Sequence, residues 1–99
     1  MLYMIVGQIG PDSVARREAA RPDHLQRLHA LLNEGRLVLA GPCPAIDCPD
    51  PGPAGYSAGL IVAEFPSLAE ATTWAQDDPY VHADVYQEIV VRPFRQALP

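Results

Sequence analysis

The sequence contains two kinds of side chain that can exchange protons near neutral pH. There are three histidines, His24, His29 and His82, and 12 Asp and Glu residues, two of which are adjacent in the segment WAQDDPYV (Asp77 and Asp78). A neutral imidazole accepts a proton on one ring nitrogen, and a carboxylate bonded to the other nitrogen fixes the tautomer. A His and an Asp brought together in this way can act as a general acid/base. The question is which His and which Asp the fold places together.

His24 is the only histidine that the helical period directs inward. A stripe of leucines defines the apolar side of the helix, and it consists of Leu25, Leu28, Leu31 and Leu32. On a helical wheel His24 lies within about 50° of the centre of this stripe, whereas His29 lies about 90° away. A single inward histidine is more often a structural residue with satisfied hydrogen bonds than a catalytic one. Both interpretations remain open at this point.

Asp78 is the better candidate of the two adjacent carboxylates. It precedes Pro79, which excludes it from helical dihedral angles, and Pro79 suits the first position of a new short turn. Asp77 is expected on the solvated end of the preceding helix. An Asp before a Pro is commonly an N-cap that accepts a backbone amide. Capping does not exclude a second bond to His24.

The elements that must position these residues follow from the hydrophobic pattern. Short apolar runs predict strands over residues 2–8, 36–40, 59–65 and 85–92, the last closed by Pro93. A helix capped by Asp12 or Ser13 should run to Gly35, with Pro22 either restarting or kinking it. Ser67 and Glu70 form a capping box, so a second helix should extend to about residue 76. Residues 41–55 hold five prolines and read as a loop that covers something.

The element order βαββαβ predicts an α+β fold, the ferredoxin-like sandwich, with a four-stranded antiparallel sheet and two helices on one face. In this topology the first helix begins at the end of the sheet where the second helix finishes. His24 and Asp78 should therefore meet at that end. Strands 59–65 and 85–92 are apolar on both faces, and two helices cover only one of them. We expect a second copy to pack on the other face, giving a homodimer.

Composition limits the partners. Ninety-nine residues predict a single domain, residues 1–99. The net charge of −5 and the scattered Arg residues argue against nucleic acid and anionic membranes. No apolar run approaches the roughly 18 residues that a membrane span needs, and we expect a cytoplasmic protein. Cys43 and Cys48 have neither redox nor zinc spacing and should be reduced thiols.

The segments RPDHLQRLHALLNEGRL, AGPCPAID, IVAEF, WAQDDPYV and VYQEIVVRPF together resemble the YciI-like family. The resemblance implies a dimeric α+β barrel built of ferredoxin-like subunits, with a His-Asp pair proposed to be catalytic. The matching residues here are His24 and Asp78. Arg21 belongs to the same motif and would supply positive charge for an anionic substrate. Close relatives tend to have Gly in place of Asp84.

The resemblance also bears on chemistry, because a relative is a dehydrochlorinase of a chlorinated hydroxyquinol and the fold resembles that of muconolactone isomerase. The leading hypothesis is a small enzyme without a cofactor or metal, in which Asp78 orients His24 as general acid/base on a small anionic or phenolic molecule. Arg21, Gly41, Pro42 and Tyr80 are expected to contact that substrate.

Two other functions remain open on the sequence. The first is a non-catalytic dimeric module that binds a small ligand in the same pocket. The second is a cofactor-free monooxygenase, for which the aromatic residues would be Trp74, Tyr80 and Tyr86. A metal centre of His24, His82 and Asp78 lacks the usual ligand spacing.

Overall fold

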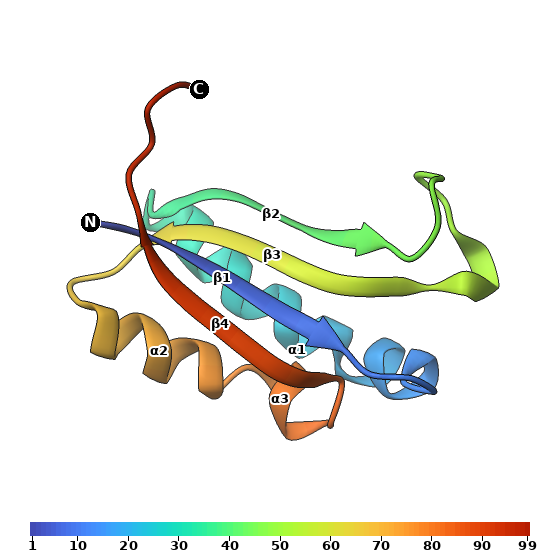
Figure 1. Ribbon diagram of the computed structural model, residues 1–99. Helices are drawn as coiled ribbons and strands as arrows, with labels where there is room; N and C mark the ends of the chain where they lie inside the picture. Colours follow the sequence, from blue (N-terminus) through green and yellow to red (C-terminus); the bar gives the residue numbers. More distant parts are fainter.

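The computed structural model describes residues 1–99 and contains one four-stranded sheet and three α-helices (Figure 1). The elements, in chain order, are β1 (Leu2–Ile9), α1 (Val14–Asn33), β2 (Leu37–Pro44), a 3-10 turn (Gly52–Ala54), β3 (Tyr56–Glu64), α2 (Leu68–Gln76), α3 (Pro79–His82) and β4 (Tyr86–Phe94). The predicted βαββαβ order is confirmed, with α3 as a short addition between α2 and β4.

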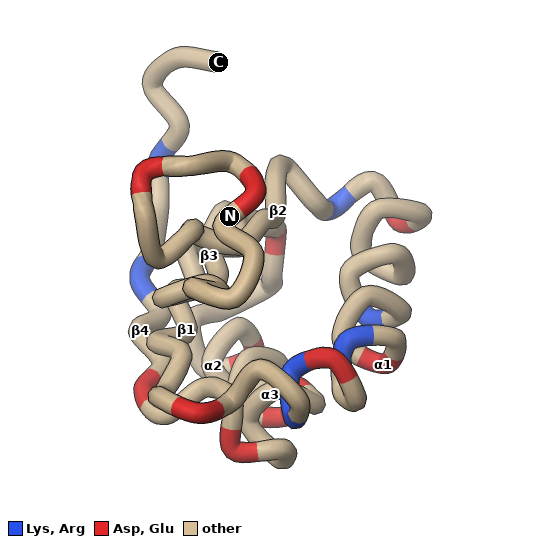
Figure 2. Tube along the Cα trace, turned by 90° about the vertical axis from the view of Figure 1, so that its right-hand side faces the viewer, with Lys and Arg blue, Asp and Glu red and all other residues tan.

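The sheet has the strand order β2-β3-β1-β4, and every neighbouring pair is antiparallel. The helices lie on one side of it, as the view along the strands shows (Figure 2). This is the ferredoxin-like arrangement that the sequence predicts. Each helical crossover joins two parallel strands with one strand between them: β3 lies between β1 and β2, and β1 lies between β3 and β4. The consecutive strands β2 and β3 form a hairpin at one edge of the sheet.

The first helix is continuous. It runs through Pro22, so neither a restart nor a break occurs there. Ser13 is its N-cap residue, but the hydroxyl donates to the Gly10 carbonyl oxygen (2.7 Å) and does not accept a helix amide. Gly35 ends the helix with φ of 73°, a left-handed conformation that glycine adopts without steric cost.

Two predicted strand ends are wrong, both at prolines, and β3 begins at Tyr56, three residues before the predicted Gly59. β2 extends to Pro44, so Gly41 and Pro42 belong to a strand and not to the predicted loop over residues 41–55. β4 likewise continues past Pro93, which pairs with Tyr3 of β1. Both β2 and β4 are edge strands. Proline is tolerated there because one side of an edge strand has no ladder hydrogen bond to lose.

The core lies between the sheet and the helices. Its fully or nearly buried members are Tyr3, Ile5, Leu28, Leu31, Ile61, Ala63, Phe65, Ala71 and Ala75. They include every second residue of the central strands and the inward stripe of α1. Leu32, which the sequence assigns to that stripe, is 53% exposed. Burial of the core side chains holds α1 and α2 on the sheet. It thereby determines which residues meet at the ends of these two helices.

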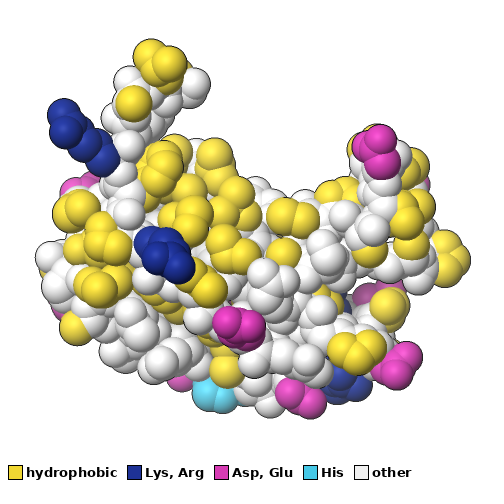
Figure 3. Space-filling view, in the orientation of Figure 1, with side chains coloured by type: hydrophobic (Ala, Val, Ile, Leu, Met, Phe, Trp, Pro, Cys, Tyr) yellow, Lys and Arg dark blue, Asp and Glu magenta, His cyan; other side chains and the backbone are white.

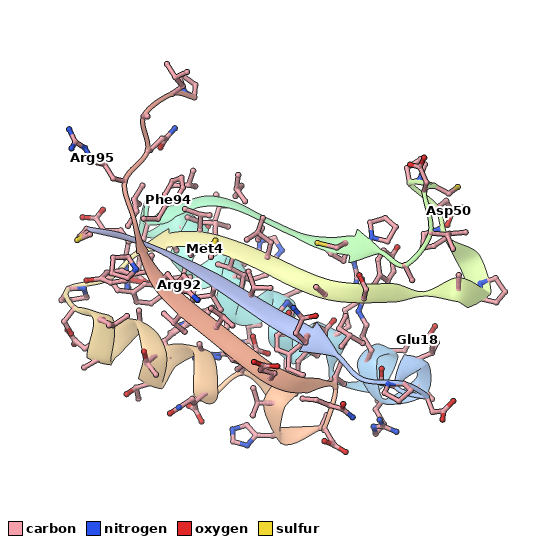
Figure 4. The ribbon with its side chains drawn as sticks, viewed as in Figure 1. Met4, Glu18, Asp50, Arg92, Phe94 and Arg95 are labelled. Atoms are coloured by element: carbon pink, nitrogen blue, oxygen red, sulfur yellow. The ribbon has the colours of Figure 1, made fainter.

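The opposite face of the sheet is also apolar. Alternation along the paired strands places Leu2, Met4, Val6, Leu60, Val62, Val90 and Phe94 on this face. Figure 3 shows these apolar surfaces gathered around one Arg side chain, and Figure 4 identifies it as Arg92, near Met4 and Phe94. The prediction that both faces are apolar is confirmed. No helix of the structure is long and apolar enough to span a bilayer.

Candidate functional site

The end of α2 places Asp78. Ser67 caps α2 by accepting the Glu70 amide (3.1 Å), as the capping box predicts. Asp78 lies outside the helices with φ of −64° and ψ of 134°, as expected before a proline, and it begins α3. Its Oδ1 accepts the Tyr80 amide at 2.8 Å. The predicted N-cap role of Asp78 is therefore confirmed.

The same carboxylate meets His24. The Nδ1 atom of His24 lies 2.9 Å from Oδ1 and 3.0 Å from Oδ2 of Asp78. The two side chains are 9% and 4% exposed. A carboxylate only accepts hydrogen bonds at neutral pH, so the proton of a neutral His24 resides on Nδ1. No protein group bonds to Nε2, which leaves its lone pair for another molecule.

Two tyrosines enclose the imidazole. The Tyr80 ring stacks on His24 with centroids 3.9 Å apart and planes 13° apart, and Tyr86 meets it edge-on at 6.3 Å. Desolvation by burial raises the pKa of both phenols. Negative charge on Asp78 adds to this rise, while the Arg17 guanidinium opposes it at both. Both hydroxyls therefore stay protonated at neutral pH.

Paired glycines make room for Tyr86. Gly7 of β1 and Gly59 of β3 are opposite one another in the sheet. A Cβ at Gly7 would lie 2.5 Å from the Tyr86 ring, and one at Gly59 would collide with the Tyr86 hydroxyl. Isolated glycines within strands are typical of such a close approach. They allow the Tyr86 ring to lie over the sheet beside His24.

A cavity of about 230 Å³ adjoins His24. Its lining includes four residues predicted to contact substrate, namely Arg21, Gly41, Pro42 and Tyr80, together with His24, Tyr86 and Arg17. Asp78 lies behind His24 and does not line it. The volume suits a single small ring or a short chain. The structure thus brings the sequence-predicted residues together, although Gly41 and Pro42 do so from a strand.

Arg17 is the residue that sequence reasoning missed. Arg17, Arg21 and His24 follow the helical spacing i, i+4 and i+7, which puts all three on one face of α1. That spacing was available in the sequence. It was obscured because Arg residues are common on solvated helix faces, and Figure 2 shows other basic residues along the same helix.

A second His-Asp pair lies nearby on the surface. His82 Nε2 is 3.0 Å from Asp77 Oδ1, with side chains 64% and 74% exposed. Asp77 is the C-cap residue of α2, as the sequence suggests. Nowhere in the structure do three His, Cys, Asp or Glu side chains gather closely enough to hold a metal ion. Cys43 and Cys48 are exposed free thiols.

Asp84 has a backbone explanation. Its φ is 57°, in the left-handed region, and it follows Ala83, the C-cap residue of α3. Glycine is favoured there and Asp is one of the few other residues that tolerate it. The Asp84 carboxylate is exposed and does not line the cavity beside His24. The residue thus acts through its backbone conformation.

A larger hollow than the one beside His24 lies elsewhere in the molecule. It measures about 820 Å³ and lies at the far end, between α1, α2 and the turn before α2. Its walls include Trp74, on which the Arg27 guanidinium rests at 4.3 Å from the ring centroid. It contains no histidine and is a wide surface groove. Trp74 therefore lines a different part of the molecule from Tyr80 and Tyr86.

The fold and site define a ferredoxin-like α+β protein with a buried His-Asp pair beside a small cavity. A model of the YCII-related domain family matches residues 1–95, and the chain belongs to this family. Protein YciI of Escherichia coli O6:H1 is 50% identical over 96 residues, which cover 97% of this chain and 98% of that protein. An uncharacterized protein of Haemophilus influenzae is 44% identical over the same length, with the same shares covered.

Among solved structures, 5-chloro-2-hydroxyhydroquinone dehydrochlorinase from Burkholderia phenoliruptrix AC1100, in complex with 2,5-dihydroxybenzoquinone, superposes with a TM-score of 0.84. The match covers 98% of this chain and 96% of that one, at 19% identity. At this identity the likeness shows the shared fold.

Proposed function

We propose that this protein is an enzyme that moves protons on a small anionic or phenolic molecule, with His24 as general acid/base and Asp78 as the group that orients it. The observation that carries the proposal is the His24 imidazole, bonded through Nδ1 to a buried carboxylate while Nε2 has no protein partner. General acid/base catalysis by a positioned histidine contributes roughly 10²- to 10⁴-fold to a rate.

The surroundings support this role. Stacking on Tyr80 holds the ring plane, and the bond to Asp78 holds the tautomer. The cavity beside His24 is mainly apolar in its lining, with Arg17 and Arg21 as positive groups that favour negative charge on a substrate. The dehydrochlorinase with the same fold removes HCl from a ring that carries hydroxyl groups, and such an elimination also requires proton transfer.

Exchange of substrate protons with solvent deuterium tests the proposal directly, because it requires only proton transfer on a model compound. Hydroxyquinol in D₂O should exchange a ring proton faster with the protein than in buffer, and ¹H NMR measures the rate. His24→Gln should reduce the protein-dependent rate at least about 100-fold, whereas His82→Gln, which alters the exposed pair, should leave it unchanged. A wild-type rate equal to that of buffer, for hydroxyquinol and for its chlorinated form, would contradict the proposal.

A non-catalytic binding module is the second candidate, because the Asp78 bond to the Tyr80 amide gives the carboxylate a structural role of its own. In that case the His24→Gln variant would still bind small hydroxylated aromatics, and neither wild type nor the variant would accelerate the exchange of ring protons. Titration of wild type and variant by NMR separates the two functions.

We also propose that the functional form is a homodimer in which a second copy covers the apolar sheet face. Val6 lies at the centre of this face, opposite Leu60 and Val90. Light scattering should give twice the chain mass, and Val6→Glu should reduce it to that of one chain. A wild-type monomer at micromolar concentration would refute the dimer.

A further inference from the structure

Arg17 lies at the boundary between two cavities. The inner cavity, of about 230 Å³, contains His24, and an outer cavity of about 440 Å³ lies between the start of α1 and the loop that joins β2 to β3. Arg17 is the one residue that lines both. Figure 4 shows Glu18, the next residue of α1, at the outer cavity's end of the molecule, below the loop that carries Asp50.

The Arg17 guanidinium has no acceptor within the protein. It forms none of the ion pairs and donates none of the side-chain hydrogen bonds, and its Nε is sealed from solvent. Arg16, Arg27 and Arg36 each donate to a carbonyl or carboxylate oxygen, and among the arginines that do not, Arg17 alone has a donor sealed from solvent. A buried donor without a partner costs free energy that an acceptor from a ligand would recover.

A second unpaired donor lies on the inner side. The Tyr80 hydroxyl is also sealed without a hydrogen-bond partner, in a residue only 2% exposed. The Arg17 guanidinium carbon is 5.7 Å from the Tyr80 ring centroid and 4.4 Å from that of Tyr56. Contact with the Tyr56 ring restrains the guanidinium, whose fork of N–H groups matches the two oxygens of a carboxylate.

We propose that Arg17 binds the carboxylate of the substrate, while the remainder of the molecule lies in the inner cavity beside His24 Nε2. This inference rests on the proposed function of His24 and narrows its substrate class from anionic or phenolic molecules to small carboxylic acids. A single guanidinium suits a single negative charge, and the outer cavity provides room for the carboxylate oxygens at the boundary. Arg21, which lines only the inner cavity, adds positive charge near the ring.

Matched ligands isolate the carboxylate. 2,5-Dihydroxybenzoate and hydroquinone share the same hydroxylated ring and differ by one carboxylate. Calorimetric titration should show that wild type binds 2,5-dihydroxybenzoate more tightly. Arg17→Gln should reduce that affinity about 10- to 100-fold, which is the range for a lost charged hydrogen bond, and leave hydroquinone binding unchanged. Arg95→Gln removes one charge from the exposed C-terminal segment and should change neither affinity.

Direct observation of Arg17 avoids dependence on a variant that could lose its fold. In ¹⁵N-labelled wild type, benzoate should shift the Arg17 Nε–H resonance, and it should do so in His24→Gln as well. If the carboxylate still binds to His24→Gln but wild type shows no proton exchange, the proposed catalysis is refuted and the proposed role of Arg17 stands. An Arg17 resonance unmoved by benzoate, or an equal carboxylate preference in Arg17→Gln, would overturn the inference.

Discussion

Two adjacent carboxylates, Asp77 and Asp78, each bind a histidine at nearly the same distance, 3.0 Å for one and 2.9 Å for the other. The pairs differ in their surroundings. Asp77 and His82 face water with more than half of each side chain exposed, whereas Asp78 and His24 are almost completely enclosed. The hydrogen bond alone therefore does not distinguish a surface contact from a candidate catalytic pair.

The difference is one of desolvation and of fixed orientation. An exposed ion pair gains little, because water screens the charges and the side chains lose entropy when they meet. In the buried pair, Tyr80 stacks on the imidazole and its amide holds the carboxylate. Neither group of this pair can turn to water, so the tautomer of His24 and the direction of Nε2 are both set before a ligand arrives.

Removal of each carboxylate should separate the two pairs most strongly. Asp78→Ala leaves the His24 Nδ1–H and the Tyr80 amide buried without an acceptor, and we expect the free energy of unfolding to fall by about 3 kcal/mol. Asp77→Ala should change it by less than about 0.5 kcal/mol. Urea denaturation of both variants measures the contrast. Similar losses in the two variants would mean that burial does not set the strength of these pairs.

Removal of His24 should also lower the free energy of unfolding more than removal of His82, but by a smaller margin than for the two carboxylates. His24→Gln loses the stack on Tyr80 and one bond of a carboxylate that still accepts the Tyr80 amide, so we expect a loss of about 2 kcal/mol. His82→Gln should lie within about 0.5 kcal/mol of wild type. Thermal and urea unfolding provide the values, and a costly His82→Gln would show that the exposed pair is structural.

Alkaline pH should reveal the enclosure of the buried pair. Burial raises the pKa of Tyr80 and Tyr86, whereas the unfolded chain loses these protons near pH 10. Above that pH the folded protein holds more protons than the unfolded chain, so its stability falls as pH rises. The slope is at most about 1.4 kcal/mol per pH unit for each tyrosine.

Tyr86→Phe checks this slope, since it removes one of the two phenols. Denaturation from about pH 9 to about pH 11 should give a shallower decline in Tyr86→Phe than in wild type. Identical slopes would show that Tyr86 ionises equally readily in the folded and unfolded chains, contrary to its burial.

The smallest effect is expected at Asp84, which belongs to neither pair. Its left-handed φ favours Gly over Ala. Asp84→Gly should therefore be more stable than Asp84→Ala by about 1 kcal/mol, with ligand binding unaltered in both. Equal stabilities, measured by urea denaturation, would indicate that the turn relaxes; altered ligand binding would place the carboxylate in the site.

Much of the fold was predictable because its signals are local. Helical periodicity identified the inward direction of His24, and the capping box at Ser67 located the start of α2 correctly. The ends of β2 and β4 were missed at Pro42, Pro44 and Pro93. Proline ends an interior strand but not an edge strand, and the edge positions of β2 and β4 follow from the overall topology, not from the local pattern around each proline.

The site was predictable in part for the same reason. Asp78 and His24 were paired through topology, since the end of one helix and the start of another share one edge of the sheet. Arg17 was not singled out, because its lack of an acceptor and its position between two cavities depend on the loop joining β2 to β3 and on Tyr56. No local pattern encodes those contacts.

By itself the sequence determined the order of elements, the inward face of α1 and the non-helical conformation of Asp78, since each follows from the chemistry of neighbouring residues. Only the tertiary structure decided how closely Asp78 and His24 approach and how completely the pair is buried. It also decided that Tyr80 would stack on that ring and that Arg17 would lack a partner. These contacts come from packing between segments that are distant in the sequence, more than fifty residues apart in the case of the His-Asp pair. The free energy of desolvation depends on all of the groups that meet there.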